Sequence, residues 1–175
     1  MKSMKKEVLV VDGYNMIGAW PELVKLKNKD FIEEARDRLL ETLSNYQVFE
    51  NKEVIVVFDA QFVPGITKEY KRYKVRVVFT AQGETADTYI EGIVDDLKNV
   101  LTEVTVATSD LAEQQLVFAK GANRMSANEL LREIRRSRRV LEKDTSHFSN
   151  FSQRKRGTWS DEQLNLLKRL RDGEN

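Results

Sequence analysis

The stretch EVLVVDGYN, residues 7–15, decides the fold. Its residues 8–11 form a short, β-branched-rich apolar run that ends in an aspartate, and EVIVVFDA at residues 53–60 repeats the pattern. Short continuous apolar runs of this kind are typical of parallel strands that are buried on both faces. Residues 75–79 and 104–107 predict two more strands, and Arg124 with Met125 predicts a short fifth one.

Helical patterns separate these strands. Residues 31–46 and 86–97 each place apolar side chains on one face at the helical period. Asp110 with Glu113, and Ser126 with Glu129, have the spacing of a capping box, which predicts that helices begin there. Because strands and helices alternate, right-handed crossovers are expected. The sequence therefore predicts an α/β fold of three α/β/α layers, Rossmann-like, with a mostly parallel sheet.

The domain organisation follows from length and composition. The chain has 175 residues, 41% hydrophobic and 33% charged, which suits one folded core. We predict that this domain covers residues 1–143. Residues 144–158 are polar and lack a period, so we expect a loop or mobile basic arm, and Ser160 with Gln163 predicts a last helix. Residues 144–175 are expected to pack on the same domain.

Composition excludes several kinds of chemistry. The chain has no cysteine and one histidine, His147, which removes disulfides, thiol nucleophiles and cysteine-rich zinc sites. Its longest apolar runs are far shorter than the roughly 18 residues of a membrane span, so we expect a cytoplasmic protein without a membrane partner. Chemistry in this chain must therefore use carboxylates.

Charge is divided unevenly along the chain. Residues 1–119 carry a net charge of −5 and residues 120–175 carry +6, although the total is only +1. This division indicates an acidic site beside a surface suited to a polyanion, whereas a solvated basic helix would give the same count.

Four acids stand where a ligand site is expected. Asp12 and Asp59 follow the first two strands, Asp87 opens a helix, and Asp110 follows the fourth strand. Ligands of open parallel sheets bind outside the carboxyl ends of the strands. Carboxylates that meet there repel one another unless a cation is bound, and their hard oxygens favour Mg²⁺ or Mn²⁺. Each acid alone also fits a turn or helix cap, so the prediction depends on their conjunction.

The chemistry of such a site is phosphodiester hydrolysis. A divalent ion held by carboxylates activates water and neutralises charge on a phosphate, and Asn15 can orient that water or the phosphate. No phosphate-binding P-loop and no glycine-rich dinucleotide motif is present. Glu84 and Glu91 could either lie near the site or be ordinary surface residues, and the sequence leaves both alternatives open.

Basic residues gather in the last third of the chain. On the helix predicted for residues 127–143, the cations share one face, opposite a row of leucine and isoleucine residues. Binding to a phosphate backbone and simple solvation both fit this stripe. The arm adds three cations among aromatic residues, as in single-stranded RNA binders. The candidate RNA-binding residues are Arg132, Arg135, Arg136, Arg139, Lys143, Arg154, Lys155 and Arg156.

The runs VDGYN, VVFDA, GETADTYIE and TSD, in this order and spacing, resemble the NYN-domain branch of the PIN-like ribonucleases, and specifically the bacterial YacP family. The resemblance implies a PIN-like fold and a Mg²⁺- or Mn²⁺-dependent endoribonuclease associated with the ribosome and with mRNA under translation. Ile93 departs from the PIN-like pattern, which often has another aspartate there. Carried over by position, the acidic pocket consists of Asp12, Asn15, Asp59, Asp87 and Asp110.

Our first hypothesis is thus a metal-dependent endoribonuclease acting on mRNA, expected to be a monomer. Asp12, Asp87 and Asp110 are predicted to bind the ion, while Asp59 supports the ligand shell or a second ion and Asn15 orients water or phosphate. The alternative is a non-catalytic RNA- or ribosome-binding factor whose acidic pocket is vestigial. A small-molecule phosphatase is a third reading.

Overall fold

A single parallel sheet forms the centre of the protein, as predicted. The computed structural model describes residues 4–62 and 73–156. The strand order is β3-β2-β1-β4-β5, so the first strand of the chain lies in the middle of the sheet. The strands are β1 (Lys6–Asp12), β2 (Glu53–Phe58), β3 (Arg76–Phe79), β4 (Thr102–Ala107) and β5 (Asn123–Met125).

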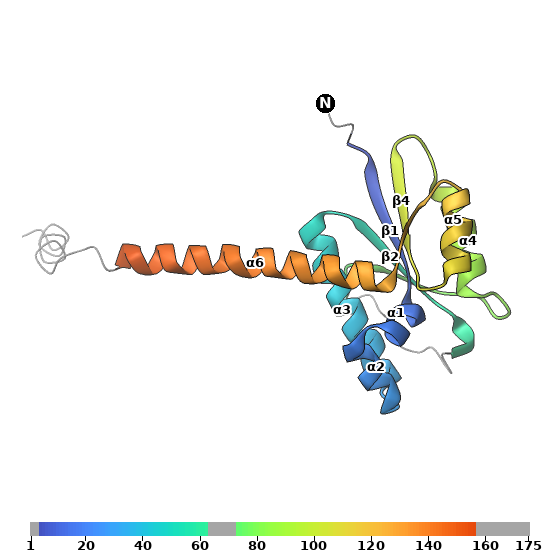
Figure 1. Cartoon of the computed structure of the whole chain (residues 1–175), viewed down its shortest axis with the longest axis horizontal. Helices are drawn as coiled ribbons and strands as arrows, with labels where there is room; N and C mark the ends of the chain where they lie inside the picture. Colours follow the sequence, from blue (N-terminus) through green and yellow to red (C-terminus); the bar gives the residue numbers. More distant parts are fainter. Residues whose placement is uncertain (1–3, 63–72, 157–175) are drawn as a thin grey trace, which may run out of the picture. The chain divides into compact units, whose positions relative to one another are not determined.

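Helices cover both faces of the sheet, which confirms the three-layer prediction (Figure 1). Helices α1, α2, α3 and the start of α6 pack on one face, and α4 and α5 pack on the other. The helices are α1 (Gly13–Ala19), α2 (Pro21–Asn28), α3 (Ile32–Glu50), α4 (Ala86–Leu97), α5 (Leu111–Ala119) and α6 (Ala127–Arg156), with a 3-10 turn, η1 (Ala60–Phe62).

The apolar runs form strands because both of their faces are buried. Leu9 and Val11 belong to the core under α3, whereas Val8 and Val10 belong to the core under α4. Alternate side chains of a strand point to opposite faces, so only a continuous apolar run fills both cores. The same alternation places Asp12, next after Val10 in this series, on the side of α4 and α5.

Two short helices, α1 and α2, were not predicted from the sequence. They bury Met16, Ile17 and Leu23 against the sheet and α3. Trp20 ends α1, precedes Pro21 at the start of α2, and donates from Nε1 to the Ala127 carbonyl at 2.8 Å. This bond ties the helix pair to the start of α6.

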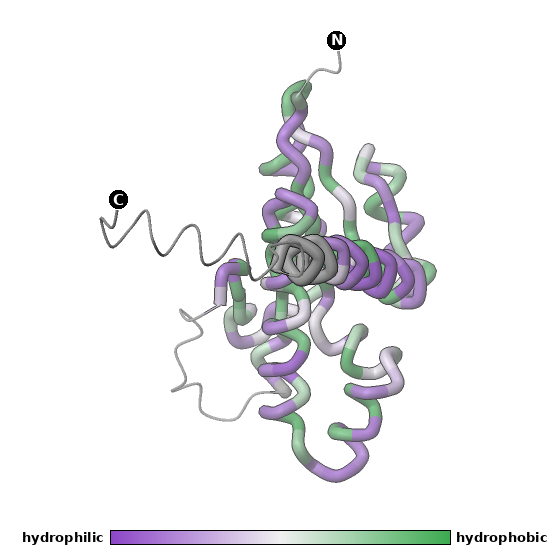
Figure 2. Tube along the Cα trace, turned by 90° about the vertical axis from the view of Figure 1, so that its left-hand side faces the viewer, coloured by the Kyte–Doolittle hydropathy of each residue, from purple (hydrophilic) through white to green (hydrophobic). Residues whose placement is uncertain are grey.

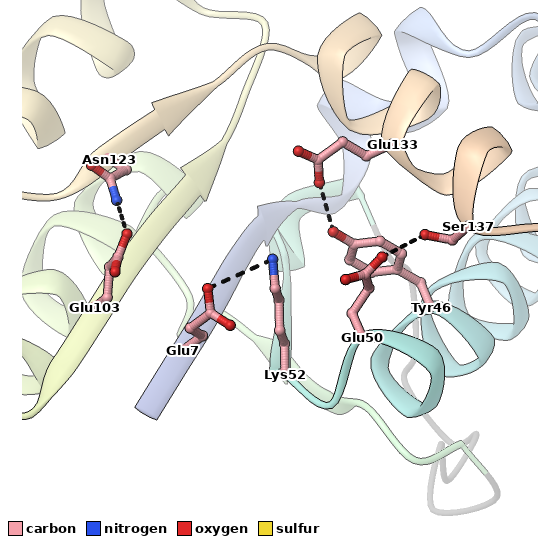
Figure 3. Close-up of polar contacts among 8 residues, drawn as sticks. All are labelled: Glu7, Tyr46, Glu50, Lys52, Glu103, Asn123, Glu133 and Ser137. Atoms are coloured by element: carbon pink, nitrogen blue, oxygen red, sulfur yellow. Dashed lines mark hydrogen bonds and ion pairs between the residues drawn. The ribbon is translucent and has the colours of Figure 1, made fainter. Parts of the chain in front are cut away.

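The first turns of α6 are anchored to α3 (Figure 3). The Tyr46 hydroxyl donates to Glu133 at 2.7 Å, and the Ser137 hydroxyl donates to Glu50 at 2.6 Å. Leu130 and Ile134 are buried beside these bonds. The helix begins with the predicted capping box, because Ser126 and Glu129 exchange backbone-to-side-chain hydrogen bonds.

The loop predicted for residues 144–158 is wrong over most of its length, because α6 continues to Arg156. Extending an existing helix avoids the cost of nucleation, so a polar segment without a period can still be helical. The Thr145 hydroxyl donates to the Leu141 carbonyl and the Ser146 hydroxyl to that of Lys143, so both are satisfied within the helix. The predicted last helix from Ser160 lies outside the described residues.

The chain divides into two compact units, residues 1–137 and 138–175. The first holds the sheet, its helices and the anchored start of α6, and the second begins within α6 at Arg138. The predicted packing of residues 144–175 on the domain stays a prediction. Among the described residues, no helix combines the length and apolar character that crossing a membrane requires.

Candidate metal centre

Asp12 ends the central strand at the carboxyl edge of the sheet. Its side chain is buried and caps α1, because its Oδ1 accepts from the Asn15 backbone N–H at 3.4 Å. Its Oδ2 accepts from Asn15 Nδ2 at 2.8 Å. Residue 13 must be glycine here, since a Cβ would stand 2.2 Å from the Phe58 ring. The DG pair therefore fixes a tight exit from β1 that presents the carboxylate.

Two helices bring further acids to Asp12. Asp87 lies in the first turn of α4, which Thr85 caps, and Glu113 lies in the first turn of α5. One carboxylate oxygen from each of Asp12, Asp87 and Glu113 lies within 4.8 Å of the others. Oxygens on opposite sides of a Mg²⁺ ion stand about 4.2 Å apart, so the spacing approaches that of a coordination shell.

The electrostatics of this cluster favour a cation. Burial, opposed by the Asn15 hydrogen bonds and reinforced by the charges of Asp87 and Asp59, raises the pKa of Asp12 to about 6. Burial above all, together with the charges of Asp12 and Asp87, also raises the pKa of Glu113, and the nearby Thr108 hydroxyl only partly offsets this. The metal-free cluster therefore holds protons that a divalent cation would replace.

Glu113 carries the strongest structural sign of a missing partner. Its side chain is 3% exposed, and neither carboxylate oxygen makes a hydrogen bond of ordinary length to a described residue, although the Thr108 hydroxyl and Asp87 lie close enough to act on its pKa. Buried polar groups are normally paired, and a carboxylate without partners is costly. An all-oxygen donor set that includes this orphaned carboxylate fits a hard cation such as Mg²⁺ or Mn²⁺.

The third predicted ion ligand, Asp110, has a capping role in the structure. Its Oδ1 accepts from the backbone N–H groups of Ala112 at 2.8 Å and Glu113 at 3.3 Å, so it caps α5 and is not among the three clustered acids. In a capping box, Glu113 would return to the Asp110 N–H, but that N–H donates to the Thr108 hydroxyl at 3.2 Å. Glu113 is thus free to face Asp12, and sequence reasoning missed it because its spacing is typical of capping.

Asp59 and Asn15 lie beside the cluster, and each makes hydrogen bonds there. Asp59 is buried, and its Oδ1 accepts from the Gln61 N–H at 3.0 Å. It is close enough to raise the pKa of Asp12. Asn15 uses both ends of its amide, because it donates to Asp12 and accepts from the Ser109 N–H at 3.2 Å. It therefore joins the ends of β1 and β4.

Glu84 and Glu91, the two acids left open by the sequence, have other contacts in the structure. Glu84 accepts from the Ala81 N–H at 3.3 Å, as a loop residue does. Glu91 is half-buried on α4, and after the bonded Asp95 its charge helps to raise the pKa of Lys120, which ends α5. Ile93, the departure from the PIN-like pattern, packs in the core with Ile90 and Val94.

The predicted RNA-binding cations lie along α6. Those for which exposure is described all face solvent, and Figure 2 shows the described part of this helix mainly in the hydrophilic colour. His147 is exposed as well. The exposed cations are Arg132, Arg135, Arg136, Arg139 and Lys143, while the side chains of Arg154, Lys155 and Arg156 lie outside the described part of the chain.

A parallel α/β domain with clustered acids at its carboxyl edge is typical of metal-dependent enzymes that act on phosphate esters. The YacP-like NYN domain family matches residues 9–172, and the chain belongs to this family. It is 43% identical over 168 residues to the uncharacterized protein YacP of Bacillus subtilis (strain 168), covering 96% of this chain and 98% of that protein.

Solved structures give the same assignment. The crystal structure of Rae1 (YacP) from Bacillus subtilis superposes with a TM-score of 0.73 at 43% identity and covers 95% of both chains. A structure of a mutant of that protein gives a TM-score of 0.73 at 44% identity over 82% of this chain and 84% of that one. The family implies a nuclease-type, RNA-related function.

Proposed function

We propose that this chain is a metal-dependent endoribonuclease that hydrolyses phosphodiester bonds in mRNA in association with the translating ribosome. The observation that carries the proposal is the buried carboxylate of Glu113, which lacks a partner and lies within 4.8 Å of Asp12 and Asp87. Family membership supports the nuclease chemistry.

In this proposal each site residue has a separate role in metal binding. Asp12, Asp87 and Glu113 hold Mg²⁺ or Mn²⁺, which when bound lowers the pKa of water and neutralises charge on the phosphate. Asn15 fixes the orientation of Asp12 through its 2.8 Å hydrogen bond. Asp110 holds the first turn of α5, and with it Glu113, through its capping bonds.

Three further features support the proposed site. Asp87 and Glu113 both lie in first helical turns, where the macrodipole favours negative charge and hence an ionised ligand. Asp59 is placed to support the ligand shell or a second ion, since its charge acts on Asp12. The exposed cations of α6 would contact phosphates of the RNA or the ribosome.

The test compares Asp12→Asn and Asp87→Asn with the wild type on translated mRNA and on the same RNA free of ribosomes, with Mn²⁺ or with EDTA. Asp95→Asn is the matched control, because Asp95 is an exposed acid on α4, paired with Lys120 at 2.7 Å. We expect cleavage to fall at least about a hundredfold in both site variants and in EDTA, and to persist in the control.

Each other outcome has a definite meaning. RNA or ribosome binding by the wild type without any cleavage would identify the alternative, a non-catalytic factor. Hydrolysis of small phosphate esters but not of RNA would identify a phosphatase. Cleavage that survives both substitutions would rule out the acidic cluster as the active site.

A further inference from the structure

Helix α5 carries large apolar side chains on the side that faces solvent, whereas its buried side includes Glu113 and Gln114. Val117 is fully buried, yet Leu111 is 72% exposed and Phe118 is 60% exposed. A surface helix normally presents polar side chains to solvent, so this outer face is unusual. Leu111, Gln115 and Phe118 are spaced i, i+4 and i+7 and form one stripe along the helix, here called the α5 strip.

A cation lies over the far end of this strip. The Arg124 guanidinium, from β5, stands 5.2 Å from the centre of the Phe118 ring in a cation–π contact. Both side chains are exposed. An exposed aromatic ring beside a guanidinium offers stacking for a base and charge for a phosphate, the two contacts that single-stranded RNA binders combine.

The charge of the outer face suits a polyanion. The carboxylate of α5 belongs to Glu113, which is buried in the candidate metal centre, and the exposed positions of the helix are all uncharged. Helix α4, which packs beside α5 in Figure 1, differs because it exposes Asp95 and Asp96. RNA would therefore meet less repulsion over α5 than over α4.

The strip begins at the end of α5 that carries the candidate metal centre, although Glu113 lies on the opposite, buried side of the helix. Leu111 directly follows Asp110, and Glu113 on the same helix reaches the acidic cluster. Seven residues of helix cover about 10 Å, so the strip leads from the site toward Arg124 over a short distance. A strand of RNA held at the site could then continue along α5.

We propose that the α5 strip and Arg124 bind the bases and phosphates of single-stranded RNA beside the cleaved bond. This inference rests on the proposed function, because it names the part of the substrate that lies next to the site. Phe118 is the stacking residue, Arg124 supports its ring and contacts phosphate, and Leu111 packs against the base nearest the metal centre.

The experiment measures binding without cleavage. Full-length protein in EDTA is titrated into a fluorescent single-stranded oligoribonucleotide of mixed sequence, and anisotropy gives Kd. We expect Phe118→Ala to weaken binding about tenfold and Phe118→Trp to preserve it. Arg124→Ala should weaken binding and lower its salt dependence. Phe31→Ala is the matched control, since Phe31 is 53% exposed on the N-terminal side of α3, and thermal melts verify that all variants fold.

Three results would overturn the inference. One is an unchanged Kd for Phe118→Ala in a folded protein, and another is an equal loss for Phe31→Ala. The third is a concentration-dependent dimer that Phe118→Ala abolishes while RNA affinity stays the same, which would make the strip a self-association face. Failure of the proposed function looks different: the wild type would bind RNA through Phe118 and still not cleave it with Mn²⁺.

Discussion

Asn15 holds Asp12 from two directions, with its backbone N–H 3.4 Å from Oδ1 and its side-chain Nδ2 2.8 Å from Oδ2. The same amide accepts from the Ser109 N–H, which follows β4. One side chain thus couples the ends of two adjacent strands to the carboxylate at the centre of the cluster.

Asn15→Ala should therefore weaken metal binding without removing a ligand. Loss of a supporting hydrogen bond typically lowers metal affinity by about 10- to 100-fold, and we expect a Mn²⁺ titration to show a loss in this range. The pKa of Asp12 should also rise further, because the lost side-chain bond from Asn15 lowers it, while the backbone bond remains. Asn45→Ala, at an exposed position of α3, is the control. Unchanged Mn²⁺ affinity would mean that Asn15 acts elsewhere.

Asp110 and Glu113 should respond in opposite ways to conservative replacement. Serine can cap α5 in place of Asp110, so Asp110→Ser should keep Mn²⁺ affinity, whereas Asp110→Ala should cost about 1 kcal/mol of stability. Glu113→Gln should weaken Mn²⁺ binding at least about tenfold, because it removes a charged oxygen ligand. Calorimetric titration with Mn²⁺ measures the affinity of Asp110→Ser and of Glu113→Gln. Strong loss in Asp110→Ser would restore Asp110 as a direct ligand.

The metal-free protein should lose stability as pH rises. The folded-state pKa of Asp12 is about 6, above its ordinary value of 3.8, so the folded state binds this proton more tightly than the unfolded state. The resulting stabilisation is fully present below about pH 4 and is lost as pH rises through 6, a change of about 3 kcal/mol.

Asn at position 12 does not titrate, so comparing Asp12→Asn with the wild type isolates the contribution of the Asp12 proton to stability. Urea unfolding in EDTA should show the variant gaining stability relative to the wild type between pH 4 and pH 7. Added Mn²⁺ at pH 8 should stabilise the wild type more than the variant. A difference between the two proteins that stays constant with pH would contradict the burial of Asp12.

The cations of α6 should give RNA binding its salt dependence. Each phosphate contact in single-stranded RNA contributes about 0.7 to the slope of log K against log salt, so replacing Arg132, Arg136 and Lys143 by alanine should reduce that slope by about 2. The replacements are exposed and should leave folding unchanged. If the variant and the wild type gave the same slope, these side chains would not contact RNA phosphates.

The fold was predictable because its signals are local. Continuous apolar runs at Val8–Val11 and Val54–Phe58 specify buried strands, and both strands are confirmed. Helices α1 and α2 were missed because they are short and begin with a glycine and a proline, residues that are typical of turns. Helical structure beyond residue 143 was missed because it depends on propagation from the anchored start of α6.

The candidate site was only partly predictable. The positions of Asp12 and Asp87 follow from strand ends and helix starts, and the structure brings these two together. The choice between Asp110 and Glu113 depends on which carboxylate the helix cap uses, and the Thr108 hydroxyl decides that by accepting from the Asp110 N–H. This hydrogen bond cannot be predicted from the spacing of the acids in the sequence.

The pairing of β1 with β4 joins residues that are 96 positions apart in the chain. Asp12 leaves the ribosome early during synthesis, but Glu113 emerges only after two-thirds of the polypeptide has been made. A nascent or prematurely terminated copy that ends before α5 thus lacks Glu113 and carries an incomplete acidic cluster.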